Sequence, residues 1–307
     1  MFRRLLLGAA LLPLLGCSDD AIAPTQIEPA FSKGDNAGLI AFASRRTGTS
    51  YELYTMEPDG SAVNRLTVTS GREIDPSWSP DGRMLVYSFR DSNLVWHLLL
   101  INADGTGAIP LTRGPANDRM PDWSPKGPNG GRIVYQSDAS GDPELYSIGI
   151  DRTNPVRLTY SPGQDFDPVW SPDGKRIAFA SERSGDVEIY VMNADGTDVT
   201  RLTYYAGYES GPSWSPDGRR IAFNRQIGLS SEIFVMNDDG TGLAPLTIGG
   251  GSDPAWSPDG RQIVFQRDIN GEFQLFTMNA DGTDVTQITF VVPGSGAPAW
   301  SSRRNPK

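Results

Sequence analysis

Hydrophobic and polar residues alternate along this chain in a unit that recurs every 42 to 47 residues. The clearest copy predicts four short strands separated by three reversals. These strands cover residues 167–170, 176–181 and 187–192 and a last segment that ends at Leu202-Thr203. The reversals carry Ser-Pro-Asp-Gly or Asn-Ala-Asp-Gly, in which proline fixes φ and glycine supplies a positive φ. The pattern therefore predicts a repeated four-stranded antiparallel sheet.

The second strand of each unit is apolar on both of its faces. Two alternate sites carry a large apolar residue, and a small or β-branched residue lies between them. The two sites are Ile40 and Phe42, Leu85 and Tyr87, Ile133 and Tyr135, Ile177 and Phe179, Ile221 and Phe223, and Ile263 and Phe265. A strand with this pattern has no solvated face, so each sheet must lie between two neighbours.

One tryptophan ends the first strand of each full copy. The six are Trp78, Trp123, Trp170, Trp214, Trp256 and Trp300. This spacing fits a propeller blade better than a helical or leucine-rich repeat. The first copy has no tryptophan strand before Ile40, and the Trp300 strand has no blade after it. We predict an all-β fold over residues 38–307, a six-bladed β-propeller closed non-covalently where the Trp300 strand pairs with the first blade.

The amino-acid composition agrees with this fold class, and the net charge disfavours one class of binding partner. The 307 residues include 34 glycines and 24 prolines, and 38% are hydrophobic, which suits short strands and many turns. The formal net charge of −10 makes nucleic acid an unfavourable partner.

The first 37 residues differ from the repeat. Arg3 and Arg4 precede an apolar segment over 5–15, and Gly16 precedes the chain's one cysteine, Cys17. This resembles the lipobox of bacterial lipoproteins, so we predict a signal peptide over 1–16 and a lipid on Cys17. Residues 17–37 then form a flexible tether. The predicted location is the cell envelope, lipid-anchored and facing the periplasm, and Ser18 favours the outer membrane over the inner one.

The repeat resembles that of the TolB family. The shared pattern is Pro-x-Trp-Ser-Pro-Asp-Gly, then Ile-Ala-Phe, then Ile-Tyr-Val-Met-Asn-x-Asp-Gly-Thr, then Leu-Thr. TolB-like proteins carry a further N-terminal domain, where this sequence has only the tether. The resemblance implies a six-bladed propeller that docks envelope proteins, including a peptidoglycan-associated lipoprotein, and that can hold calcium in its channel.

Catalytic residues are not predicted. His97 is the only histidine, and its repeat position carries a carboxylate or amide in the other copies. Those residues are Glu52, Glu144, Glu188, Glu232 and Gln274. A structural polar position therefore explains His97 better than a general base does. The sequence also has no Gly-x-Ser-x-Gly nucleophile motif.

Three aspartates are the candidate metal ligands. Asp75, Asp167 and Asp253 each lie three residues before a tryptophan, in every second blade. Carboxylates that converge on the propeller axis suit Ca²⁺ or Mg²⁺. The alternative is that they bond backbone amides at the start of each inner strand, and no cofactor is then required.

Partner binding is predicted on the face that lacks the uniform turns. Its candidate residues are Arg45, Arg46, Arg72, Arg119, Arg183, Tyr204, Tyr205 and Tyr208. Mixed charge and tyrosine fit a protein-docking scaffold. One alternative is a polysaccharide lyase that uses Asp167 and Asp253 for acid–base work. Another is a non-catalytic binder of glycan or peptidoglycan, in which the tyrosines stack on sugars.

Overall fold

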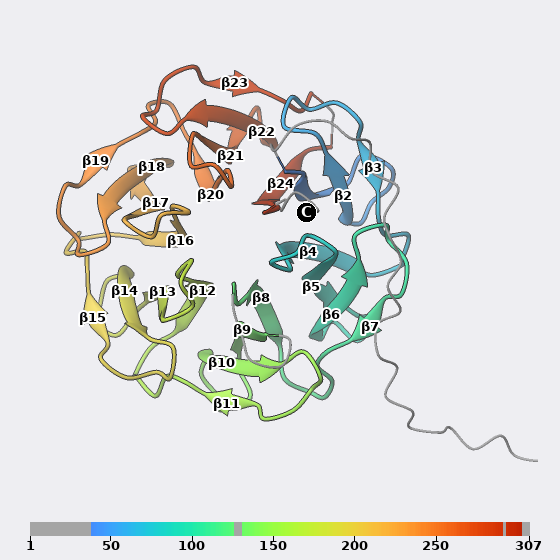
Figure 1. The fold of residues 1–307 in the computed structure, drawn as a ribbon, viewed down its shortest axis with the longest axis horizontal. Coiled ribbons are helices and arrows are strands. Elements are labelled where there is room, and N and C mark those ends of the chain that lie inside the picture. Colours follow the sequence, from blue (N-terminus) through green and yellow to red (C-terminus); the bar gives the residue numbers. More distant parts are fainter. Residues whose placement is uncertain (1–37, 126–130, 291–292, 303–307) are drawn as a thin grey trace, which may run out of the picture. The chain divides into compact units, whose positions relative to one another are not determined.

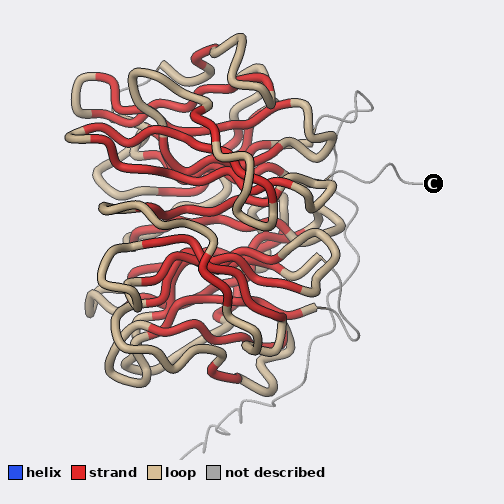
Figure 2. The backbone as a smooth tube through the Cα atoms, turned by 90° about the vertical axis from the view of Figure 1, so that its left-hand side faces the viewer, coloured by secondary structure: helices blue, strands red, loops and turns tan. Residues whose placement is uncertain are grey.

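Six four-stranded antiparallel sheets surround a central axis (Figure 1). The computed structural model describes residues 38–125, 131–290 and 293–302. Strands and loops make up these residues (Figure 2). None of their elements is a helix long and apolar enough to cross a membrane. The prediction of an all-β, six-bladed propeller is confirmed. The predicted leader, Cys17 and the tether lie outside the described residues.

Each blade has the same four strands, ordered from the axis outward. The inner strands are β4 (Arg72–Trp78), β8 (Asp118–Trp123), β12 (Asp165–Trp170), β16 (Glu209–Trp214), β20 (Ser252–Trp256) and β24 (Ser295–Trp300). The second strands are β1 (Ile40–Ser44), β5 (Met84–Arg90), β9 (Arg132–Ser137), β13 (Arg176–Ser181), β17 (Arg220–Ile227) and β21 (Gln262–Ile269).

The two outer positions follow the same rule. The third strands are β2 (Glu52–Met56), β6 (Trp96–Asn102), β10 (Glu144–Gly149), β14 (Glu188–Asn193), β18 (Ser230–Asn237) and β22 (Glu272–Asn279). The outermost strands are β3 (Asn64–Arg65), β7 (Ile109–Pro110), β11 (Val156–Arg157), β15 (Thr200–Arg201), β19 (Ala244–Pro245) and β23 (Thr286–Gln287).

The hydrophobic cores lie between blades. One core contains Ile189 of β14 together with Trp214 of β16 and Phe223 of β17, which belong to the next blade. Phe223 and its equivalents Phe42, Phe179 and Phe265 are fully buried. Burial of one such side chain stabilises the fold by about 1.5–3 kcal/mol. Each blade thus depends on its neighbours for most of its stability.

A threonine attaches the outermost strand to the third strand of the same blade. In β14, the Ile189 amide donates to Thr203 Oγ1 (2.9 Å), and Thr203 Oγ1 donates to Glu188 Oε2 (2.5 Å). The blade that contains Glu144 repeats this arrangement with Thr159. The threonine of the repeated Leu-Thr or Ile-Thr pair accepts this buried backbone hydrogen bond in all six blades.

The last strand of the chain completes the first blade. β24 pairs antiparallel with β1, with Ile40 opposite Trp300 and Ser44 opposite Ser295. The Leu39 amide donates to Ser301 Oγ at 2.7 Å. This junction covers the edge and the apolar face of β1, which an open chain of blades would expose.

Removal of β24 should destabilise the whole propeller. A chain that ends at Phe290 leaves β1 without its edge partner, and we expect its free energy of unfolding to fall by more than about 4 kcal/mol. For a domain of this size that lowers Tm by roughly 10 °C or more. Thermal unfolding followed by circular dichroism tests this, with a chain that ends at Ser302 as control. Equal melting of the two chains would refute the stabilising role of the junction.

Candidate functional site

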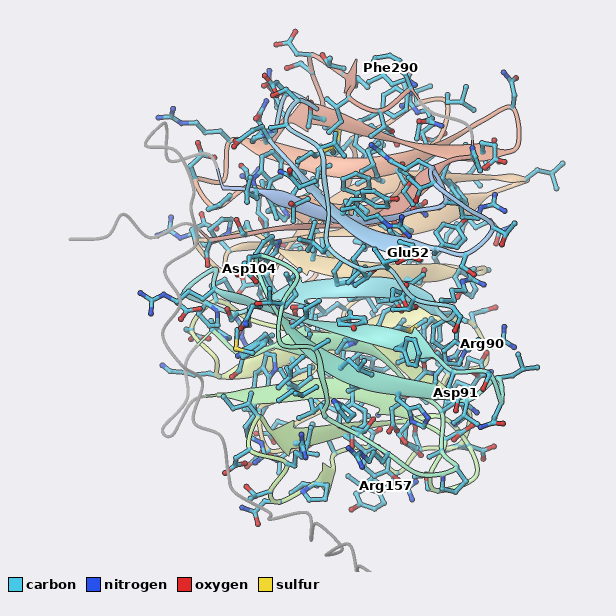
Figure 3. All side chains as sticks on the ribbon, turned by 90° about the vertical axis from the view of Figure 1, so that its right-hand side faces the viewer. Glu52, Arg90, Asp91, Asp104, Arg157 and Phe290 are labelled. Atoms are coloured by element: carbon cyan, nitrogen blue, oxygen red, sulfur yellow. The ribbon has the colours of Figure 1, made fainter. Side chains whose placement is uncertain are left out.

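The propeller has two faces of different construction. The turn face carries the Ser-Pro-Asp-Gly and Asn-x-Asp-Gly turns, and the loop face carries the second-to-third-strand hairpins and the connections between blades. Figure 3 shows Asp104 on the turn face, and Arg90 and Asp91 on the loop face. Hydrogen bonds of the turn aspartates to turn residues make the turn face uniform. In one copy Ser171 Oγ donates to Asp173 Oδ1 at 2.7 Å, and this bond lowers the pKa of Asp173.

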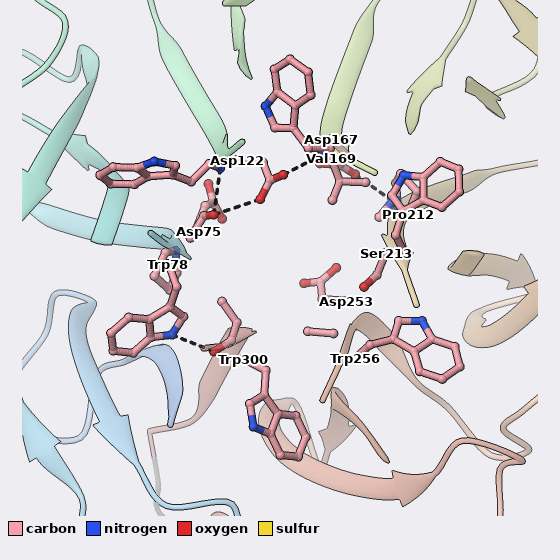
Figure 4. A pocket seen from close by; sticks show the side chains of 18 of the residues that line it. Asp75, Trp78, Asp122, Asp167, Val169, Pro212, Ser213, Asp253, Trp256 and Trp300 are labelled. Carbon is pink, nitrogen blue, oxygen red and sulfur yellow. Dashed lines mark hydrogen bonds between the residues drawn. The ribbon is translucent and has the colours of Figure 1, made fainter. Parts of the chain in front are cut away.

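A cavity of about 510 Å³ lies on the axis and is lined by the inner strands (Figure 4). Each inner strand has a β-bulge three residues before its tryptophan, and the bulged residue has a positive φ of 50° to 60°. The six bulged residues are Asp75, Met120, Asp167, Gly211, Asp253 and Ala297. Aspartate and glycine tolerate this left-handed conformation better than most residues. The backbone conformation therefore explains why aspartate occurs at three of these six positions.

The three predicted aspartates all line this cavity, and each has a protein partner. Asp167 Oδ2 accepts from the Gly211 amide of the next blade at 3.0 Å. Asp75 Oδ2 accepts from Ser88 Oγ at 3.2 Å, and Asp253 Oδ1 accepts from Asn224 Nδ2 at 3.3 Å. The carboxylates thus join neighbouring strands and blades.

Burial and mutual repulsion favour the protonated form of these aspartates. Burial, and after it the charge of Asp253, raise the pKa of Asp167 to about 7 and that of Asp75 to about 6. Arg119 opposes both shifts, which places it near these two carboxylates. Within the described part of the chain, no three His, Cys, Asp or Glu side chains are close enough to share a metal ion. The three aspartates therefore do not form a complete carboxylate cage, and calcium stays a prediction of the resemblance.

Asp122 is a fourth carboxylate that lines the channel, and the sequence pattern did not predict it. Asp122 Oδ1 accepts from Ser77 Oγ at 2.9 Å, and its Oδ2 accepts from the Trp170 amide at 2.8 Å. These bonds connect the inner strands of three blades. Burial raises the pKa of Asp122 to about 6. A sequence signal existed, because the other copies have serine, alanine or valine immediately before the tryptophan.

Several inner strands begin with a buried acidic residue. Glu209 accepts from Arg225 Nε at 2.6 Å, and Asp165 accepts from Arg183 Nη2 at 2.8 Å. Burial raises the pKa of Glu209 to about 7. His97 lies on the third strand at the equivalent of Glu188, and its Nε2 is 3.6 Å from Asp91 Oδ2.

Four of the predicted partner-binding arginines have intramolecular partners. Arg45 pairs with Glu272 at 3.0 Å, and Arg183 pairs with Asp165 at 2.8 Å. Arg46 lies over the rings of Phe42 and Tyr54, and Arg72 lies over those of Tyr51 and Trp96. Repeat position located these residues at the loop face, but it could not show that their guanidinium groups bind within the protein.

Exposed apolar side chains distinguish the two faces most clearly. Among the described residues, seven large hydrophobic side chains are between 64% and 106% exposed, and all seven lie on the loop face. They are Val68, Leu94, Tyr160, Tyr204, Leu229, Ile248 and Phe290. On the turn face the most exposed one is Val156, at 46%. Of the predicted tyrosines, Tyr204 belongs to this set, Tyr208 is 42% exposed and Tyr205 is half-buried.

Together the six sheets, the bulged inner strands and the axial cavity define a six-bladed β-propeller. The TolB beta propeller domain matches residues 127–226 and 205–305, which together are more than half of the chain. The chain therefore belongs to the TolB β-propeller family.

Individual relatives match only part of their own length. A TolB homolog from Chlorobium chlorochromatii is 36% identical over 137 residues, which are 45% of this chain and 30% of that protein. Dipeptidyl-peptidase 5 from Porphyromonas endodontalis is 32% identical over 36% of this chain and 16% of its own length. The crystal structure of TolB from Acinetobacter baumannii has a TM-score of 0.78 at 24% identity, covering 88% of this chain and 68% of that one.

The raised pKa of Asp167 makes stability depend on pH in a defined direction. A carboxylate whose pKa is higher in the folded than in the unfolded state stabilises the fold below pH 4, and this contribution is lost as the pH rises through about 7. Asp167→Asn keeps an acceptor for the Gly211 amide and removes the charge. We expect the variant to gain stability over the wild type as the pH rises from 4.5 to 8, measured by urea unfolding.

Asp195→Asn serves as the control for this experiment. Asp195 is an exposed turn residue whose pKa is lowered by its bond from Thr197, so its removal should change the pH dependence slightly in the opposite direction. Parallel stability profiles for wild type and Asp167→Asn would contradict the assigned burial of the channel carboxylate.

Proposed function

We propose that this protein is a lipid-anchored scaffold of the bacterial envelope that docks another envelope protein on its loop face. The main observation in support is that the most exposed apolar side chains of the described residues all lie on this face. Exposed apolar groups on one face of a rigid disc favour association with a partner. The family resemblance suggests a peptidoglycan-associated lipoprotein as that partner, facing the periplasm near the outer membrane.

Five of the seven exposed side chains lie on four consecutive blades, and we call them the apolar arc. Going round the ring in Figure 1, it runs from the β16–β19 blade to the β4–β7 blade. Its members are Leu229, Ile248, Phe290, Val68 and Leu94. The blades that carry these residues pack tightly against one another. The backbone beneath the apolar arc is therefore rigid and loses little conformational entropy when a partner binds.

The point at which the chain enters the propeller supports this choice of face. β1 begins at Ile40 on the turn face, where Gly38 approaches Ser301 and Leu39 bonds to it. A tether from a lipidated Cys17 therefore joins the face opposite the apolar arc. Anchoring and docking then use different faces of the disc.

A structural role accounts for the buried carboxylates better than catalysis does. Asp167 and Asp253, which a lyase would use, accept hydrogen bonds from neighbouring strands or blades. His97, the one histidine, faces Asp91 on the loop face and not the channel carboxylates. The match to a dipeptidyl-peptidase covers only 16% of that protein. We therefore assign the propeller a scaffold function.

Photocrosslinking in cells tests the choice of face. A photoreactive phenylalanine analogue at Ile248 or Leu229 should give adducts with a peptidoglycan-associated lipoprotein, detected with an antibody against it. The same analogue at Val199 or Leu243, which are partly exposed on the turn face, is the matched control. Equal adducts from both faces, or adducts only from the control positions, would contradict docking on the loop face.

Replacement of the predicted lipidation site tests the anchor. Cys17→Ser removes the thiol that accepts the lipid, so we expect loss of palmitate labelling and transfer of the protein from the membrane to the soluble fraction. Ser18→Ala is the control, because it leaves the cysteine in place. Unchanged fractionation of the Cys17→Ser variant would remove the anchor from the proposal.

A further inference from the structure

The exposed residues that follow the repeated Leu-Thr or Ile-Thr pair divide the loop face into two chemical sectors. In ring order these residues are Val68, Arg113, Tyr160, Tyr204, Ile248 and Phe290. The aliphatic and phenylalanine side chains belong to the apolar arc. Tyr160 and Tyr204 are adjacent in the series, at the ends of the β8–β11 and β12–β15 blades. With Tyr205 and Tyr208 we call them the tyrosine arc.

Each of these two tyrosines rests on a fixed cation. The Arg157 guanidinium lies 4.4 Å from the centre of the Tyr160 ring, and the Arg201 guanidinium lies 4.4 Å from that of Tyr204. Arg157 Nη2 donates to the buried Glu144 at 2.8 Å, and its Nε donates to the Thr159 carbonyl at 2.7 Å.

The second copy of this arrangement is equivalent. Arg201 Nη2 donates to the buried Glu188 at 2.5 Å, and its Nε donates to the Thr203 carbonyl at 2.6 Å. Because each arginine is held by two hydrogen bonds, each tyrosine ring is supported as a flat plate. Tyr160 and Tyr204 are 74% and 78% exposed as whole residues, which leaves the ring face opposite the arginine open to a ligand.

The blade with Val68 shows that this support does not require tyrosine. Arg65 pairs with the buried Glu52 at 3.0 Å, as in the two tyrosine blades, but valine occupies the exposed position. At the position after the Leu-Thr or Ile-Thr pair, an aromatic ring on a held arginine occurs only in these two adjacent blades of the described propeller. A ligand that repeats along its length would meet one plate in each of them.

The surroundings of the plates are polar. Between residues 131 and 215, all exposed large hydrophobic side chains on the loop face are tyrosines. The hairpins of the same two blades both carry exposed Ser-Gly-Asp, at 140–142 and 184–186. In each, the serine Oγ donates to the aspartate carbonyl, so the two hairpins share the same local backbone structure. Aromatic faces beside hydroxyl and carboxylate groups combine stacking with hydrogen bonding.

We propose that the tyrosine arc binds a neutral oligosaccharide of pyranose units. The C–H face of a pyranose stacks on an aromatic plate, and its hydroxyl groups donate to carboxylates such as Asp142 and Asp186. The arginine on one face of each ring weakens the attraction of the open face for a second cation, which disfavours a basic peptide on the plates. A polyuronate is disfavoured by repulsion from the two exposed carboxylates. Tyr160 and Tyr204 belong to two blades that contribute no residue to the apolar arc, so this inference does not rest on the proposed docking.

Calorimetric titration of the full-length protein tests the site. The probes are chitohexaose, a neutral β-1,4-linked hexosaccharide, and hexagalacturonate as its acidic counterpart. We expect chitohexaose to bind, and the double variant Tyr160→Ala, Tyr204→Ala to lose about tenfold or more in affinity. The variant Tyr160→Phe, Tyr204→Phe keeps both plates and should stay within about threefold of wild type. All variants should melt near the wild-type temperature, because both side chains are exposed.

Two controls separate this site from the proposed docking. Val68→Ala, Ile248→Ala changes the apolar arc and should leave chitohexaose affinity unchanged, whereas the tyrosine variants should leave the photocrosslinks from Ile248 unchanged. Failure of wild type to bind chitohexaose at millimolar concentration overturns the proposal. So does tighter binding of hexagalacturonate, or full affinity in the tyrosine-to-alanine double variant.

Discussion

The burial of both faces of each second strand is the constraint on which this structure depends. In β13, Ile177 and Phe179 are fully buried on one face and Ala178 and Ala180 on the other, so neither face of the strand meets water. Each blade needs a neighbour on both sides, so the array is stable only when no blade is terminal. Pairing of β24 with β1 meets this requirement without a covalent link. The stiffness of the disc, and of everything displayed on it, follows from this closure.

Closure also explains why so many charged groups are buried without forming an active site. When neighbouring blades stack, polar residues at the ends of the inner strands come between them, and each needs a partner there. Glu209 with Arg225 and Asp165 with Arg183 satisfy this need at the loop face. Asp122 and Asp167 satisfy it along the channel through backbone amides of adjacent blades. The raised pKa values of Asp122, Asp167 and Glu209 therefore result from the burial of these carboxylates in the packed ring.

The sequence predicted backbone positions far better than side-chain partners. The interval between tryptophans and the paired apolar sites located the blades and their order, and repeat position brought Asp75, Asp167 and Asp253 to the channel. Repeat position cannot show which neighbour a long side chain reaches, so it predicted Arg45 and Arg183 as partner-binding residues without showing their internal ion pairs. The left-handed bulge at Asp75 could not be predicted from the sequence either, because it does not change the pattern of hydrophobic positions. Tyr160, in contrast, occupies the same repeat position as Tyr204 and was accessible to alignment of the copies.

The two faces differ because the repeat motif constrains only one of them. Conformations with positive φ and serine-to-aspartate hydrogen bonds fix the residues of the turn face in the four Ser-Pro-Asp-Gly copies, so the chemistry of these turns is nearly the same. At the loop face, the residue after each Leu-Thr or Ile-Thr pair is free to vary, because its side chain contributes little to the core. The backbone holds valine, arginine, tyrosine, isoleucine and phenylalanine at this one position. A rigid ring with such positions can carry two chemically different surfaces side by side, so that docking and ligand binding need not compete for the same residues.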